Sequence, residues 1–334
     1  FFPSVSAAWR ISAEPFMEPF SGVLSNLKLR TSWGRAGTDN IGQFQYMSAY
    51  GTGGDAVFGG QNPEIAPGYT ETRFPNPNIT WETSEMFNIG IDASFFNGKL
   101  NLEADWFYKK TNDILRERTD MPAILGYKLP AANVGKVDNR GIDLNITHRN
   151  HLRDFNYSIA GNLTWARNKV IDLLEPAGEK NNPRQRSTGH SMSQYFGYEA
   201  LGLFQSDEEA NNWPQPQFGK AKAGDIKYKD QNGDGIIDAE DEIAIGRSNY
   251  PELVYGLNLN AEWKGFDITF FFQGAALADF YYNGYLAFPY IEGRGGALLE
   301  HHIGNTWTPE NPKAEFPRLY YGGNANNQLF SSFW

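Results

Sequence analysis

The chain has 334 residues, of which 40% are hydrophobic and 15% aromatic, so it is long enough to build one large architecture. Its formal net charge of −10 and its lack of a lysine or arginine run argue against nucleic-acid binding. The absence of cysteine excludes disulfides, thiolate chemistry and zinc–thiolate sites. No apolar stretch approaches the ~18 residues of a membrane-spanning helix, so none is expected.

The dominant pattern along the chain is an alternation of apolar and polar residues, which predicts an all-β fold. In 86–96, Phe87 and Ile89 share one face, while Asn88 and Asp92 share the other. The same pattern recurs elsewhere. The predicted strands, in chain order, are 4–11, 26–33, 86–96, 99–109, 141–149, 154–166, 252–263 and 266–273.

Local signals mark the turns and one short helix between these strands. Asn97-Gly98 is the dipeptide most typical of a tight hairpin, and Lys264-Gly265 predicts a second turn. Residues 206–213 form the best helical segment, with Ser206 placed to cap its N-terminus.

The predicted strands run to about ten residues, which is longer than strands of soluble sheets and close to what a tilted strand needs to cross a bilayer. Aromatic residues lie near several strand ends, where a membrane interface favours them. These are Trp33, Tyr108, Trp165 and Trp263. The pattern favours an antiparallel transmembrane β-barrel. Alternation alone leaves a soluble sandwich open, since such a sheet also has one wet and one dry face.

Long insertions rich in glycine, proline and asparagine separate the strands. They are 35–80, 113–135, 175–192, 207–250 and 275–327. Loops of this length are usually functional or packed against something, and in an outer-membrane barrel the long loops face outside.

The stretch "KDQNGDGIIDAEDE" (229–242) has the spacing of a calcium loop within an acidic insertion, 224–246. Gly235 occupies the sixth position, where such loops turn sharply. The predicted ligands are Asp230, Asn232, Asp234, Ile236 through its carbonyl, Asp238 and Asp241. The last ligand is aspartate rather than glutamate, and the flanks alternate like strands, unlike an EF-hand. The loop is either a Ca2+ site or an acidic, glycine-rich turn.

Catalytic patterns are weak, and the chain is predicted not to be an enzyme. "GHSMS" (189–193) places a histidine beside a serine but lacks the G-x-S-x-G elbow. His301-His302 has no third metal ligand at a suitable spacing. Aromatic residues of "YYNGYLAFPY" (281–290) could stack on sugar rings or pack within a loop. The substrate-binding candidates are therefore Tyr281, Tyr282, Tyr285 and Tyr290.

Seven stretches, in order, resemble the SusC/RagA family of TonB-linked outer-membrane transporters along nearly the whole chain. They are "FFPSVSAAWRISAEPFM" (1–17), "LSNLKLRTSWGRAGTDNIGQFQY" (24–46), "NPNITWETSEMFNIGID" (76–92), "NVGKVDNRGIDLNI" (133–146), "FGYEALGLFQSDEEA" (196–210), "GDIKYKDQNGDGIIDAEDEIAIG" (224–246) and "WTPENPKAEFPRL" (307–319). The acidic loop is itself a habitual feature of that family.

The resemblance implies a plugged β-barrel in the outer membrane of a Gram-negative bacterium, surrounded by its lipid. A SusD-like surface lipoprotein would close over it as a lid, and the TonB–ExbB–ExbD system would drive import of oligosaccharides or peptides. The family pattern also includes a plug domain and final strands that this sequence lacks. About nine strands are counted, whereas such transporters need about 22 to close around a plug. The chain is therefore expected to be an internal, incomplete part of the barrel.

Two functional classes follow from these observations. The first is a component of a nutrient importer, to which the seven ordered matches point. The second is a soluble secreted β-protein, such as a glycan-binding or adhesive module, with a structural calcium loop.

Overall fold

The computed structural model describes residues 1–39, 43–60, 63–117, 131–175, 184, 186–290, 298–320 and 324–334. The chain forms two compact units. The barrel unit comprises Phe1–Ala177, Ser187–Met192 and Pro251–Leu277, and the loop unit comprises Gly178–Arg186, Ser193–Tyr250 and Ala278–Trp334.

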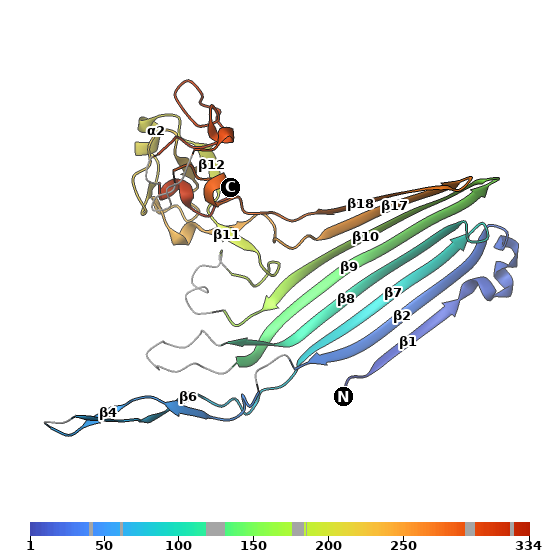
Figure 1. Ribbon diagram of the computed structural model, residues 1–334, viewed down its shortest axis with the longest axis horizontal. Helices are drawn as coiled ribbons and strands as arrows, with labels where there is room; N and C mark the ends of the chain where they lie inside the picture. The colour runs from blue at the N-terminus through green and yellow to red at the C-terminus, as the bar shows by residue number, and fades with distance from the viewer. Residues whose placement is uncertain are drawn as a thin grey trace. The chain divides into compact units, whose positions relative to one another are not determined.

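The barrel unit is built on one eight-stranded sheet with the order β1-β2-β7-β8-β9-β10-β17-β18, in which every neighbouring pair is antiparallel (Figure 1). The strands are β1 (Ser4–Arg10), β2 (Leu24–Thr38), β7 (Glu82–Phe95), β8 (Leu100–Glu117), β9 (Ala131–Leu152), β10 (Phe155–Asp172), β17 (Leu253–Trp263) and β18 (Phe266–Ala276). All eight predicted strand segments are confirmed, and the described residues place no ninth strand in this sheet.

Tight turns join successive strands at one end of the sheet, and longer connections lie at the other end (Figure 1). Asn97 and Gly98 have φ of 55° and 82°, and Lys264 and Gly265 have φ of 47° and 86°. Two successive residues with positive φ twist a hairpin in the direction that its strands prefer. Both predicted turns are therefore confirmed. Two 3-10 helices, Ile11–Ala13 and Pro15–Phe20, connect β1 to β2 at the turn end.

The strands are longer than the alternation predicted, since β9 has 22 residues and β8 and β10 have 18 each. In β9 the apolar side of the alternation stops before the strand does. Directly before Gly141, toward the N-terminus of β9, both faces are polar over residues 138–140, with Arg140 on the side that Ile142 occupies and Asn139 on the other. The alternation of residue types therefore predicts only the apolar part of this strand. The backbone hydrogen bonds between strands continue beyond that part.

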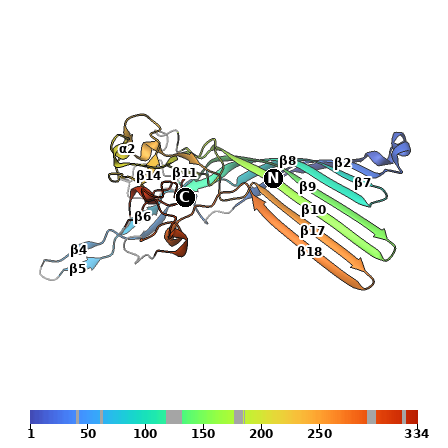
Figure 2. The same ribbon diagram turned by 90° about the horizontal axis from the view of Figure 1, so that it is seen from above.

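The connection between β2 and β7 forms a separate arm made of two nested pairs of short strands (Figures 1 and 2). The strands are β3 (Ala49–Thr52), β4 (Ala56–Phe58), β5 (Glu64–Ala66) and β6 (Tyr69–Arg73), pairing β3 with β6 and β4 with β5. In the part of the chain that the structure describes, no helix has the length and apolar character needed to span a bilayer.

The loop unit contains short elements of its own. They are β11 (Tyr195–Gly197), β12 (Ala200–Leu203), α2 (Asp207–Asn211), β13 (Gln215–Pro216), β14 (Ile226–Tyr228), β15 (Ile236–Ile237), β16 (Ile243–Ile245) and 3-10 helices at Ala239–Asp241, Gly284–Leu286, Glu300–His302 and Asn326–Gln328. Ser206 caps α2 by accepting from Glu209 N, so the predicted short helix is confirmed. The strands predicted on both sides of the acidic loop are β14 and β16.

A hydrophobic core and a set of side-chain hydrogen bonds join two distant segments within the loop unit. Tyr198, Ile226 and Tyr228 are buried in this core. Asn327 Oδ1 accepts from Ile226 N at 2.8 Å, and Tyr228 donates from its hydroxyl to Asn326 O at 2.7 Å. The insertions 207–250 and 275–327 therefore do not remain separate loops, because they share one core.

Candidate functional site

The two faces of the sheet differ in polarity. Large apolar side chains on one face are exposed, among them Ile91, Trp106, Ile142 and Ile159, each at least 41% exposed. A continuous exposed face of this size suits contact with lipid. The other face carries asparagine and charged residues and therefore suits a hydrated barrel interior.

Arg30 is the centre of a charge network on the polar face. Its guanidinium donates to Asp92 on β7, with 2.7 Å between Nη2 and Oδ1. It also reaches Asp105 on β8, with 2.9 Å between Nη2 and Oδ2. Arg30, Gly90 and Asp105 lie in one row across three strands, and a Cβ on Gly90 would lie 2.2 Å from Asp105 Oδ1. Gly90 thus leaves the space that the arginine crosses.

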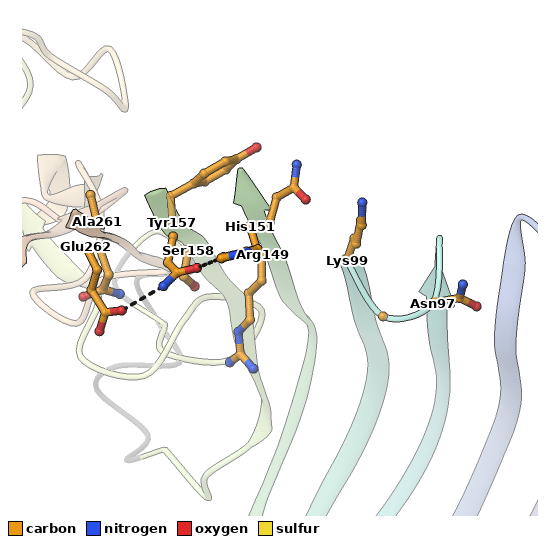
Figure 3. A pocket seen from close by; sticks show the side chains of 12 residues that line it. Asn97, Lys99, Arg149, His151, Tyr157, Ser158, Ala261 and Glu262 are labelled. Carbon is orange, nitrogen blue, oxygen red and sulfur yellow. Dashed lines mark hydrogen bonds between the residues drawn. The ribbon is translucent and has the colours of Figure 1, made fainter. Parts of the chain in front are cut away.

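A groove of about 530 Å³ lies at the turn end of the sheet (Figure 3). Polar side chains form a row across three strands in it: His151 on β9 hydrogen-bonds to Asn156 on β10, and Asn156 Nδ2 donates to Glu262 Oε2 on β17 at 3.2 Å. Lys99 and Arg149 add positive charge. The groove offers donors and acceptors of both charge signs, which suits a polar partner surface.

The acidic loop folds around its own backbone N–H groups. Asp230 Oδ2 accepts from Gly235 N at 2.9 Å, Asn232 Oδ1 accepts from Asp234 N at 3.0 Å, and Asp234 Oδ1 accepts from Ile236 N at 2.8 Å. Gly235 has φ of 85°, as the predicted sharp turn at the sixth position requires.

Asp241, predicted as the twelfth-position ligand, is fully buried. Its Oδ1 accepts from Gln231 N at 2.7 Å, and its Oδ2 accepts from Asp238 N at 3.0 Å. Over the described residues, no group of three or more acidic or histidine side chains lies close enough to hold a metal ion. The oxygen donors are of the type that calcium prefers, and several already accept bonds within the loop. Calcium binding stays a prediction.

The four predicted aromatic residues do not gather in one place. Tyr281 lies against Phe330 with 4.1 Å between ring centroids, whereas the hydroxyl of Tyr282 lies 3.4 Å from His301 Nε2. Tyr281 lines a pocket of about 380 Å³ within the loop unit that Tyr285 and Tyr290 do not line.

The pocket beside Tyr281 combines aromatic rings with polar groups that remain available. Tyr195, Asp279, Phe330 and Trp334 also line it. Asp279 Oδ2 accepts from a backbone N–H at 2.6 Å. Its Oδ1 and the hydroxyls of Tyr195 and Tyr281 form no hydrogen bond with another described residue. Burial raises the pKa of Tyr281, so its hydroxyl stays protonated and can donate. The sequence did not predict a role for Tyr195, Asp279 or Phe330, because no local pattern links residues so far apart.

His301 and His302 converge on one carbonyl oxygen. Their Nε2 atoms lie 2.8 and 3.1 Å from Leu286 O. Nδ1 of the fully buried His302 accepts from Leu299 N, so Nε2 carries the proton and the ring is neutral. The pair therefore has a structural role in the loop unit.

We expect acidification to loosen the segment around His302. Burial, followed by the nearby His301, lowers the pKa of His302 below its ordinary value of 6.5. The unfolded segment then binds more protons than the folded one, so the stabilisation is complete above about pH 6.5 and is lost as the pH falls below it. Limited proteolysis of the whole protein at pH 7.5 and 5.5 measures this loss. His302→Gln should remove the pH dependence; an unchanged dependence in that variant would contradict the assignment.

An antiparallel sheet of long strands with one exposed apolar face and one polar face is typical of the wall of a transmembrane β-barrel. Comparison with known proteins agrees. The model of the family "TonB dependent receptor-like, beta-barrel" matches residues 1–240, and the chain belongs to this family. The family places it in the outer membrane of a Gram-negative bacterium, as predicted. The soluble secreted alternative is thereby set aside.

Among its relatives, TonB-dependent receptor P26 of Formosa agariphila is 34% identical over 97% of this chain and 32% of its own length. TonB-dependent receptor SusC of Bacteroides thetaiotaomicron is 28% identical over 86% of this chain and 28% of its own length. The fold matches the structure titled "Structure of the RagAB peptide transporter" with a TM-score of 0.73 at 22% identity, covering 98% of this chain and 35% of that one. The chain spans about a third of the length of these relatives.

Proposed function

We propose that this chain is part of an outer-membrane, TonB-dependent importer of oligosaccharides and not an enzyme. Its strands form part of the barrel wall, and its polar face lines the import path. The observation that carries the proposal is the eight-stranded sheet with opposite face polarities, together with membership of the TonB-dependent receptor family. Further strands would pair with β1 and β18, since unpaired sheet edges are not stable within a membrane.

The proposed partners follow from the same family membership. A SusD-like surface lipoprotein would close over the barrel on the outside, where the long connections lie. TonB, with ExbB and ExbD, would act from the periplasm on a plug domain, and the groove of Figure 3 would face that side. Relatives named SusC and RagAB support this arrangement.

The pocket beside Tyr281 supports an oligosaccharide as the substrate. Aromatic rings provide flat apolar surfaces for sugar rings, while the available hydroxyls and carboxylate oxygen can bond to sugar hydroxyls. Its volume of about 380 Å³ lies in the range of small-molecule sites. A peptide is the alternative substrate, because the matching structure is titled as a peptide transporter.

Native mass spectrometry tests this proposal on protein extracted in mild detergent from its own outer membranes, without overexpression. The expected species is much heavier than the 37.6 kDa chain, travels with a lipoprotein and retains an oligosaccharide. A retained peptide would replace the substrate assignment. A partner-free species of 37.6 kDa that is soluble without detergent would overturn the importer proposal.

Removing the Tyr281 ring should weaken oligosaccharide binding by the complete transporter about fivefold, because a stacked ring contributes about 1 kcal/mol. Isothermal titration of the Tyr281→Ala transporter with the retained oligosaccharide measures the effect. Tyr285→Ala is the matched control, since Tyr285 belongs to the same segment but does not line the pocket. If both variants and the wild type bound the oligosaccharide with equal affinity, the pocket beside Tyr281 would not be a substrate-binding site.

A further inference from the structure

The barrel unit carries a group of cations on the same face as its apolar side chains. Lys110 on β8, Arg140 on β9, and Arg167 and Lys169 on β10 lie where the apolar band ends and the strands continue. All four residues are exposed. We call these four residues the basic band.

Strand alternation places the basic band on the lipid-facing side. Lys110 follows Trp106 and Tyr108 by even steps along β8, and Arg140 precedes Ile142 by an even step along β9. On β10, Arg167 likewise follows Trp165. The pairing is regular through this region, so the alternation is not interrupted.

Cross-strand pairing brings like charges together within the basic band. Arg140 lies directly opposite Arg167, and Asp138 lies between Lys110 and Lys169 in the next row. Like charges directly opposite each other destabilise a sheet. Because Arg167 has an acidic partner in Glu252, the arrangement favours a further anion beside Arg140.

Among the described residues, an acidic side chain pairs with only one of the four cations of the basic band. Arg167 pairs with Glu252, with 3.2 Å between Nε and Oε1. Asp138 accepts from the Tyr108 hydroxyl at 2.5 Å. Across the residues with described positions, no carboxylate oxygen lies within 4.0 Å of the charged nitrogens of Lys110, Arg140 or Lys169, the three remaining members. Three cations thus have no carboxylate partner among the described residues, and one of them, Lys110, lies with its Nζ 5.5 Å from the centre of the Tyr108 ring.

The position of the basic band along the strands indicates which leaflet of the outer membrane it contacts. The tight turns lie at the opposite end of the strands, and in outer-membrane barrels short turns face the periplasm while long loops face outside. The band therefore lies at the outer boundary of the membrane, beside the aromatic rings of Trp106, Tyr108 and Trp165. A ligand there needs acyl chains for the apolar face and anionic oxygens for the cations.

We propose that the basic band binds the phosphate groups of an anionic lipid of the outer leaflet, of which lipopolysaccharide is the abundant source. The acyl chains lie against the apolar face below the band, and the phosphates bridge Arg140 to its neighbours on β8 and β10. Basic residues beside a membrane surface recognise anionic headgroups in this way. The proposal requires only that the chain is a barrel wall, and it is independent of the transported substrate.

Lipid retention tests the proposal in the complete protein. We expect wild-type protein purified in mild detergent to bind lipopolysaccharide from its host, and the double variant R140Q/K169Q to bind it about thirtyfold more weakly. Each cation near a membrane surface contributes about fivefold to binding. Lys109→Gln is the matched control, because Lys109 is adjacent to Lys110 in sequence but lies on the polar face.

The measurement is the shift in melting temperature on adding lipopolysaccharide, compared with inorganic phosphate at the same phosphate concentration. We expect a shift with lipopolysaccharide in the wild type and in K109Q, a much smaller one in R140Q/K169Q, and none with inorganic phosphate in any of them. Equal shifts in all three proteins would overturn the proposal. An equal effect of inorganic phosphate would replace the lipid by a free-phosphate site.

Discussion

Replacing Asp225 with alanine should unfold the loop unit while leaving the barrel unit intact. Asp225 has no exposed surface. Arg318 Nε donates to its Oδ1 at 2.7 Å, and Asn324 Nδ2 and Asn327 Nδ2 donate to the same oxygen at 2.9 and 3.0 Å. Lys222 N donates to its other oxygen at 2.8 Å. Removing one partner of a buried, hydrogen-bonded ion pair costs about 3–5 kcal/mol.

Hydrogen exchange of the whole protein, followed by mass spectrometry, resolves this loss by segment. Backbone amides of 224–228 and 324–334 should exchange faster in Asp225→Ala, while those of β8 and β9 should not change. Asp234→Ala is the matched control, because Asp234 is an exposed acid of the same unit. If Asp225→Ala exchanged at the wild-type rate, the buried pair would not hold these segments together.

Placing arginine at Leu144 should destabilise the folded barrel by about 2–4 kcal/mol, the cost of a charge at the middle of the lipid-facing surface. Leu144 lies on β9 between Ile142 and Ile146, at the centre of the apolar band. The neighbouring Asn145 points to the other face, so Asn145→Arg should cost little, and its position opposite Glu103 favours a positive charge.

Urea-dependent folding of the full-length protein into lipid vesicles compares the two variants directly. The adjacent positions differ in the face they occupy but share the strand and nearly the same depth. If Asn145→Arg were instead the less stable variant, the face assigned to lipid would be the interior face, and the other face would contact lipid.

The alternation pattern was sufficient to predict the strands because a membrane and an aqueous interior impose opposite requirements on successive residues. Phe87 and Ile89 must face lipid, while Asn88 and Asp92 must not. Strand ends were not predictable in this way. Where β9 leaves the apolar band, Arg140 and Asn139 are both polar, and only backbone pairing shows that the strand continues.

The loop unit could not be predicted because its contacts join residues that share no local pattern. Asp225 and Arg318 are 93 positions apart, and Ile226 and Asn327 are 101 apart. Tyr281 was identified from aromatic content alone, but Phe330, which lies against it, belongs to another stretch. The acidic loop was recognised from its spacing, and the turn at Gly235 is confirmed. Whether its oxygen atoms bind a metal ion depends on side-chain positions that residue spacing does not determine.

In the sequence, one half of the loop unit core comes before the hairpin β17–β18 and the other half comes after it. The two halves are therefore synthesised at different times. Ile226 and Tyr228 are made first, and their partners Asn326 and Asn327 are made only after the hairpin. Contacts of such large sequence separation form late. A nascent chain that stopped at Ala276 would hold all eight strands but an open, aggregation-prone external core. Closure of that core therefore marks a chain whose synthesis has passed β18.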